Sequence, residues 1–167
     1  RQINYYQNEL QQHDFYSLNT IILKTANGLG IDAFGMDTLM KNLSGGQRAK
    51  VILAKLLLQN PDVLILDEPT NFLDREHILW LQNYLKNYKS TFLVISHDTS
   101  FLEEICTCIC DITHQSIDKY KGTFQNFLKQ KKMKGEEYEK VYLSQQKEIK
   151  KLETYIEKNK ARASTAK

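Results

Sequence analysis

Two short segments predict how this chain folds: LSGGQ at residues 43–47 and VLILDE at residues 63–68. The second predicts an apolar strand that delivers two adjacent carboxylates to its carboxyl end, downstream of a glycine pair that opens a helix. The sequence LVISH at residues 93–97 predicts another apolar strand, which ends in a histidine. We expect both strands to be buried and parallel, with the carboxylates and the histidine at one edge. That arrangement suits metal-assisted attack of water on a phosphate.

Length and charge limit the classes of protein that fit. The chain has 167 residues, 41% of them hydrophobic, which is enough for one domain plus an extended element. We expect no membrane span and no secretory signal. Residues 1–118 carry 9 Lys+Arg against 14 Asp+Glu, whereas residues 119–167 carry 14 against 6. A basic tail on an acidic globular part predicts contact with a polyanion, and the alternative is a solvated helix face.

Three cysteines occur at alternate positions: Cys106, Cys108 and Cys110. On a strand they would share one face, and a metal site would need His114 as a fourth ligand. Ligands two residues apart on a flat strand cannot easily surround a tetrahedral ion. We therefore expect small apolar packing on a core strand, with free thiols that fit a reducing cytoplasm.

The remaining pattern predicts helices alternating with parallel strands. Helical spacing at residues 1–26 ends at the glycines that follow. Ser44 is a candidate N-cap, and Gln47 completes an S-x-x-Q capping box for a helix that ends at Gln59, before Asn60 and a proline. Further elements are expected at 63–66 and 91–95 (strands), 75–87 and 101–104 (helices), and 105–112 with 116–120 (an antiparallel hairpin at the sheet's edge).

A long helix is expected over residues 123–160, a range without proline. If unbroken, this helix would be about 57 Å long. Residues repeat at heptad spacing as an a/d seam. Since that seam is too apolar to stand alone, we expect one arm of an antiparallel helical hairpin whose return helix lies beyond residue 167. The seam consists of Tyr138, Tyr142, Gln145, Ile149, Leu152 and Ile156.

The start of the helix at residue 44 predicts an anion site. Gly45 and Gly46 let a phosphate approach the backbone, Ser44 adds a hydroxyl, and the first N–H groups of the helix are unpaired. The alternative is an ordinary N-cap followed by flexible glycines.

The strand ends predict the catalytic groups. Asp67 is placed to hold Mg²⁺, directly or through water, and Glu68 to orient or deprotonate the attacking water. His97, at the end of the next strand, would face the same edge and contact a γ-phosphate. The alternatives are two carboxylates that cap the next helix and a core histidine.

Together these motifs resemble the nucleotide-binding domain of the ATP-binding cassette superfamily. Residues 43–47 resemble its signature loop, residues 64–67 its Walker B segment, Glu68 its catalytic glutamate and His97 its switch histidine. Leu73 and Asp74 resemble the loop that crosses to a partner domain. The resemblance implies that ATP and Mg²⁺ are bound, with Ser44, Gly45, Gly46, Gln47, Asp67 and Asp74 as cofactor-binding residues.

The sequence DEPTNFLD at residues 67–74 resembles the ABC-F branch, in which a histidine usually stands where this chain has Phe72. The branch implies two cassettes in one cytoplasmic chain, which acts on the ribosome in translation or in antibiotic resistance. On this resemblance, residues 1–26 are the end of an arm insertion, 27–121 a partial nucleotide-binding domain, and 122–167 the start of a basic linker. The expected partners are the second nucleotide-binding domain of the same chain and ribosomal RNA or tRNA.

No G-x-x-x-x-G-K-[S/T] phosphate loop (Walker A) occurs in the 167 residues. We therefore expect that loop upstream of Arg1 and little or no hydrolysis by this chain alone. Two other hypotheses remain open. One is the ATPase subunit of a membrane transporter, and the other is an interaction module without catalysis. The expected fold class is α/β: a partial P-loop NTPase domain followed by a long helix.

Overall fold

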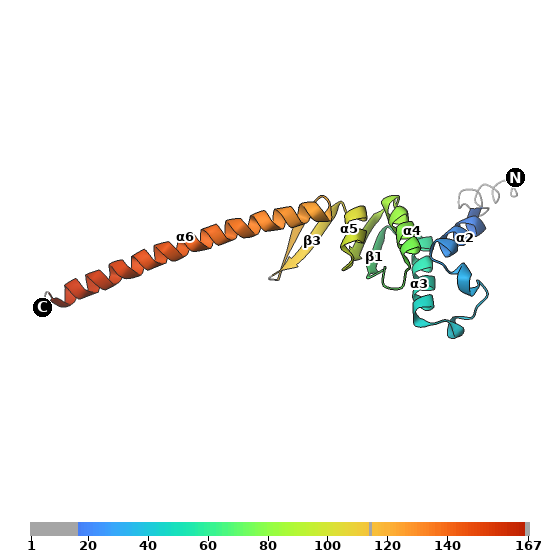
Figure 1. Cartoon of the computed structure of the whole chain (residues 1–167), viewed down its shortest axis with the longest axis horizontal. Helices are drawn as coiled ribbons and strands as arrows, with labels where there is room; N and C mark the ends of the chain where they lie inside the picture. Colours follow the sequence, from blue (N-terminus) through green and yellow to red (C-terminus); the bar gives the residue numbers. More distant parts are fainter. Residues whose placement is uncertain (1–16, 114, 166–167) are drawn as a thin grey trace, which may run out of the picture. The chain divides into compact units, whose positions relative to one another are not determined.

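The computed structural model of the chain describes residues 17–113 and 115–165, with side chains up to residue 159 (Figure 1). The predicted helical spacing before residue 17 lies outside this range. The chain divides into two compact units, the first ending at Ile105 and the second beginning at Cys106. In the described residues, the first unit combines several helices with one pair of strands, and the second combines one helix with another pair.

The first unit begins with two helices joined by an irregular connection. Helix α2 runs over Leu18–Gly28 and helix α3 over Gly45–Gln59, and between them lie the short 3₁₀ helices η2 (Asp32–Phe34) and η3 (Met40–Asn42). Asn60 has a left-handed conformation and ends α3, as the sequence predicts. The predicted bounds of α3 are therefore confirmed.

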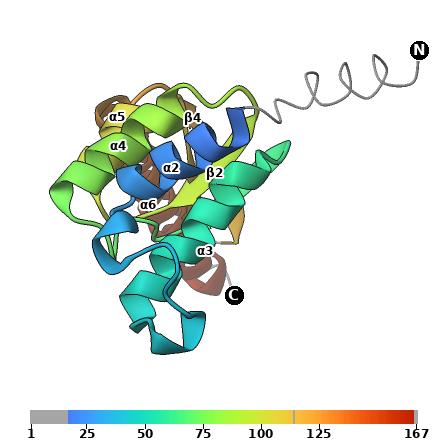
Figure 2. The same cartoon turned by 90° about the vertical axis from the view of Figure 1, so that its right-hand side faces the viewer.

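Two parallel strands and two more helices complete this unit. Strand β1 (Val63–Asp67) pairs in parallel with β2 (Thr91–Ile95), and helix α4 (Arg75–Lys86) connects them. Helix α5 (Thr99–Ile105) follows β2. Figure 2 shows α4 beside α2, and the two helices are in contact. The fully buried side chains of the core are Leu29, Leu57, Leu64, Leu81, Leu85 and Phe101.

Strand β1 is buried on one face only, and the corresponding face of β2 is half-buried, which corrects the expectation that both strands are buried. Leu64 and Leu66 point into the core, at 2% and 4% exposure, whereas Val63 and Ile65 are 58% and 62% exposed. Successive side chains of a strand point to opposite faces, so packing on one side covers every second residue.

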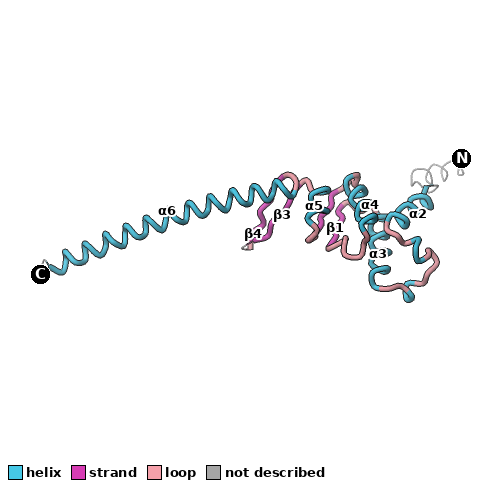
Figure 3. Tube along the Cα trace, in the orientation of Figure 1, coloured by secondary structure: helices cyan, strands magenta, loops and turns pink. Residues whose placement is uncertain are grey.

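The second unit contains a hairpin and a long helix (Figure 3). Strands β3 (Cys108–Thr113) and β4 (Ser116–Lys121) pair antiparallel in a two-stranded sheet of their own. The predicted hairpin is thus confirmed as a sheet of its own within the second unit, and its place at the edge of the parallel sheet stays a prediction. In the described residues, β3 and β4 form ladder hydrogen bonds only with each other.

The cysteines do not form part of a core strand, contrary to the expectation. Cys106 precedes β3, Cys106 and Cys108 are half-buried, and Cys110 is exposed. None of the three forms a disulfide bond in the described part of the chain. Among the described residues there is no cluster of three metal-binding side chains, and His114 lies outside them. Apolar character alone does not bury these residues: among the described residues of the second unit, α6 packs on the hairpin through its first turns.

Helix α6 (Phe124–Thr165) has 42 residues and is about 63 Å long at 1.5 Å per residue. Its first turns pack on the hairpin: the Tyr120 and Phe127 rings lie 5.1 Å apart, and both residues are buried. Lys131 Nζ lies 2.7 Å from Asp111 Oδ2, and Lys134 Nζ lies 3.0 Å from Asp118 Oδ1. These two lysines of the basic tail are therefore paired with acids of the hairpin.

Beyond these turns, the apolar seam of α6 is exposed. Its aromatic and aliphatic members are between 47% and 69% exposed. The return helix that would cover them stays a prediction. None of the helices in the described part has the long apolar run that a membrane span requires.

Candidate functional site

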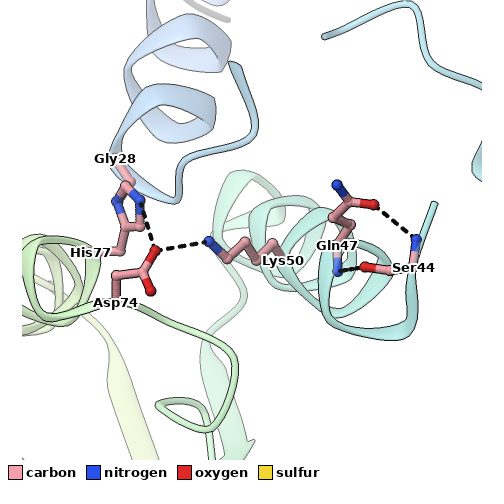
Figure 4. A network of polar contacts seen from close by, with 6 residues as sticks. All are labelled: Gly28, Ser44, Gln47, Lys50, Asp74 and His77. Carbon is pink, nitrogen blue, oxygen red and sulfur yellow. Dashed lines mark hydrogen bonds and ion pairs between the residues drawn. The ribbon is translucent and has the colours of Figure 1, made fainter. Parts of the chain in front are cut away.

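The amino end of α3 is organised by the predicted capping box. Gln47 N–H donates to Ser44 Oγ at 3.3 Å, and Ser44 N–H donates to Gln47 Oε1 at 2.8 Å (Figure 4). A Cβ on Gly45 would meet nothing within 4 Å, whereas one on Gly46 would touch Phe72. The box fixes the helix start, and open space at Gly45 leaves the first turn accessible to an anion.

Asp67 and Glu68 lie where β1 ends. Asp67 is the last residue of the strand and is exposed, opposite Ile95 in the register. Glu68 has φ +46°, and its N–H donates to the Ile95 carbonyl at 2.8 Å. A non-glycine residue rarely adopts positive φ and does so at a cost of about 1–3 kcal/mol. The turn after β1 therefore holds Glu68 in a strained conformation.

The Glu68 carboxylate faces the end of β2. Its Oε1 lies 3.5 Å from His97 Nε2, and the His97 side chain is almost fully exposed while that of Glu68 is 22% exposed. Oε1 is buried and has no hydrogen-bond partner among the described groups. An unpaired buried acceptor costs about 1–3 kcal/mol, so the position suits an incoming donor such as water. The structure thus brings together the two residues predicted to be catalytic.

A hollow of about 180 Å³ adjoins this strand end. Its lining includes Asp67, Glu68, Phe72 and Lys50. Lys50 projects from α3 and is 13% exposed. The hollow therefore places a cation on the same surface as the two predicted functional carboxylates.

Asp74 stands at the N-cap position of α4, where its side chain makes no cap hydrogen bond. Its Oδ2 instead lies 3.9 Å from Lys50 Nζ and 4.0 Å from His77 Nε2 (Figure 4). Asp74 was predicted from the sequence, whereas Lys50 and His77 were not. The three-residue spacing of Asp74 and His77, which puts them on one face of a helix, was the only feature of the sequence that could have indicated this contact, and none indicated Lys50.

Asp98 fixes the backbone just after His97. Its carboxylate accepts hydrogen bonds from Ser100 Oγ at 2.6 Å and from the N–H groups of Ser100 and Phe101 at 3.0 Å. The bond from the Ser100 hydroxyl, followed by that from Phe101 N–H, holds the pKa of Asp98 below its usual value. Asp98 thereby caps α5 and fixes the backbone directly after His97.

Replacing this cap should destabilise the chain in a pH-dependent way. We expect Asp98→Ala to lower the free energy of unfolding by about 1 kcal/mol at pH 7. Since the folded pKa is depressed, the stabilisation is complete above the usual carboxyl pKa and disappears as pH falls through the lowered folded value. Urea denaturation at pH 7 and near pH 2 measures this. An equal difference at both pH values would contradict the assignment.

With the geometry established, comparison with known proteins defines the class. Residues 3–71 match the family ABC_tran and residues 110–167 the family ABC_tran_Xtn, both described as ABC transporter. A solved structure, "Structure of ATP binding subunit of ABC transporter", has a TM-score of 0.59 at 19% identity. The match covers 77% of this chain and 54% of that one, and it supports the fold alone. These findings define an ABC-type ATP-binding domain.

Curated relatives narrow the class. The "Uncharacterized ABC transporter ATP-binding protein YfmM" of Bacillus subtilis (strain 168) is 42% identical, over 95% of this chain and 31% of its own length. The human "ATP-binding cassette sub-family F member 3" is 39% identical, over 83% and 20%. The chain belongs to the ATP-binding cassette superfamily, and its relatives are of the ABC-F type. It spans less than a third of the length of these relatives.

Proposed function

We propose that the full-length protein is an ABC-F ATPase that hydrolyses ATP to ADP and phosphate and couples this reaction to action on the ribosome. The observation that carries the ATPase proposal is the pairing of Glu68 with His97 at the ends of adjacent parallel strands. The buried Oε1 lacks a partner among the described groups and lies 3.5 Å from Nε2. A carboxylate held in this way is suited to orient a water molecule or to accept its proton.

The residues present fit Mg²⁺ bound together with ATP. Mg²⁺ in nucleotide sites is held by one or two carboxylates, by substrate phosphates and by waters. Asp67 supplies one exposed carboxylate at the strand end, beside Glu68. Asp67 would hold the ion, which would neutralise charge that develops on the phosphates. Glu68 would act on the water, and His97 would contact the γ-phosphate.

The segment from Ser44 to Gln47 would bind nucleotide from the opposite cassette. Support comes from the helix start, where accessible N–H groups and the positive dipole end favour an anion. Asp74 would reach towards that second nucleotide-binding domain. Because these groups serve a composite site, and because a phosphate loop is absent from the 167 residues, this chain alone would hydrolyse little ATP.

Phosphate release by the purified full-length protein tests the ATPase proposal. We expect hydrolysis that requires Mg²⁺ and is lost when EDTA is added, and we expect none from the 167-residue chain at equal concentration. If the full-length protein releases no phosphate and the upstream sequence contains no phosphate loop, the interaction-module hypothesis replaces this one.

Action on the ribosome is supported by the charge of α6. Its lysines at 147, 150, 151 and 158 are exposed and line one shallow hollow along the helix. A long basic helix distinguishes this proposal from that of a transporter subunit, for which no comparable element is expected. We propose a cytoplasmic protein whose helical linker contacts RNA phosphates.

A further inference from the structure

We propose that His77 is a positioning residue for the Asp74 loop, which it attaches to the carboxyl end of α2. This inference rests on the proposed ATPase function, in which Asp74 reaches towards the second cassette. It concerns a residue outside the sequence motifs, and the contacts around its ring carry it.

The first contact is a hydrogen bond to a helix end. His77 Nδ1 lies 3.0 Å from the carbonyl oxygen of Gly28, the last residue of α2. A carbonyl can only accept, so Nδ1 carries the proton. The last carbonyls of a helix have no partner within it, and a histidine from another element satisfies one of them here. The imidazole is 19% exposed, so protein rather than solvent surrounds it.

The backbone at the end of α2 is shaped for this contact. Gly30 has φ +68°, and a Cβ there would overlap the His77 ring. A Cβ on Gly28 would overlap Trp80, one turn further along α4. Because neither glycine has a side chain, α4 can pack directly against the backbone at the end of α2. His77 and Trp80 therefore dock the amino-terminal half of α4 on α2.

The second contact leads from His77 to Asp74. Nε2 lies 4.0 Å from Asp74 Oδ2, and the same oxygen lies 3.9 Å from Lys50 Nζ on α3 (Figure 4). The two ring nitrogens thus connect the end of α2 to the N-cap of α4. Asp74 is 85% exposed, so its charge contact with Lys50 is weak on its own, and its 4.0 Å approach to Nε2 is an ion pair only when both ring nitrogens carry protons. The hydrogen bond to Gly28 is the anchor, and it sets the position of the first turn of α4.

Loss of the anchor should affect turnover more than ATP binding. Asp74 is separate from the groups proposed to hold Mg²⁺ and to act on the attacking water. Its proposed role is to reach the second cassette, so displacement of α4 would disturb how the two cassettes close around ATP. Small misplacements of positioning groups are costly in rate. We expect His77→Leu in the full-length protein to lower kcat by about fivefold to tenfold, with KM for ATP changed by less than about twofold.

His77→Asn is the discriminating variant. Its amide nitrogen is bonded to Cγ, as Nδ1 is, so it can still donate to the Gly28 carbonyl while the Nε2 contact is lost. We expect it to restore kcat to within about twofold of the unchanged protein. Asn83→Leu, at an exposed position on the same helix, serves as the control for an added leucine. All assays run well below each variant's thermal midpoint.

The outcomes separate this inference from the proposed function. A drop in kcat for His77→Leu, rescued by His77→Asn, supports the positioning role. Equal kcat for His77→Leu and the active unchanged protein overturns it while the ATPase proposal stands. An equal loss of kcat in His77→Leu and His77→Asn overturns the proposal that the hydrogen bond to Gly28 positions the loop. An inactive unchanged protein overturns both proposals. Nitrogen NMR of labelled histidine gives an independent readout. We expect Nδ1 of His77 to be protonated, and an unprotonated Nδ1 would also overturn the proposed hydrogen bond to Gly28.

Discussion

Replacing Glu68 by Gln in the full-length protein is expected to reduce steady-state ATP hydrolysis by about 100-fold or more. Gln has nearly the same shape as Glu, so the turn after β1 and its positive φ are retained. It cannot accept a proton, however, and its neutral amide polarises water poorly. The buried Oε1, 3.5 Å from His97 Nε2 and without a hydrogen-bond partner in the described structure, is the acceptor that the substitution removes, and the adjacent Asp67 carboxylate is assigned to Mg²⁺ instead.

Binding should survive this substitution. We expect Glu68→Gln to retain ATP and to accumulate in the closed state, because the groups proposed to bind nucleotide are unchanged. Phosphate release and nucleotide retention after gel filtration measure the two effects. Glu139→Gln makes the same chemical change at an exposed position of α6 and should hydrolyse ATP normally. Unchanged hydrolysis by Glu68→Gln would refute its assignment as the base.

Features that depend on local sequence were predictable. The capping box of Ser44 and Gln47, the end of α3 at Gln59 and the bounds of β2 all follow from residues within a few positions of each other. Such interactions use short-range hydrogen bonding and apolar periodicity, which a single sequence displays. The pairing of Glu68 with His97 was also accessible, because parallel strands bring their carboxyl ends to one edge.

Burial was less predictable, because an apolar residue requires a partner that the pattern does not identify. Val63 and Ile65 belong to an apolar strand but are exposed, and Cys110 alternates correctly yet is also exposed. The interaction that joins α4 to the end of α2 was missed. His77 binds the carbonyl of Gly28, 49 residues earlier, and no periodicity connects them.

Two lysines near the start of α6 hold the helix on the hairpin and are unsuited to a test of RNA binding. Lys131 and Lys134 pair with hairpin acids at 2.7 and 3.0 Å, so reversing either would disturb the base of α6. Their ammonium groups also lie over the rings of Phe127 and Tyr120. Lysines further along the helix are free of these contacts and line a common hollow: Lys147, Lys150, Lys151 and Lys158.

Helix geometry separates those four lysines from the apolar seam. At 100° per residue, the centre of the lysine stripe lies about 180° from the centre of the seam formed by residues 138–156. A partner helix on the seam would therefore leave the lysines accessible. Positive charge spread along one exposed face matches a phosphate backbone without reading sequence.

We expect changing all four of these lysines to Glu in the full-length, hydrolysis-deficient protein to weaken ribosome binding by about 100-fold and to lower the slope of log K against log salt by about 3. Co-sedimentation with ribosomes over a range of salt concentrations measures both quantities. Changing the same lysines to Arg preserves charge and should preserve binding. Both sets of variants alter the same four positions. If only the Glu variant loses ribosome binding, the effect is due to charge. Unaltered affinity and salt slope in the reversed protein would show that this face of α6 is not the RNA contact.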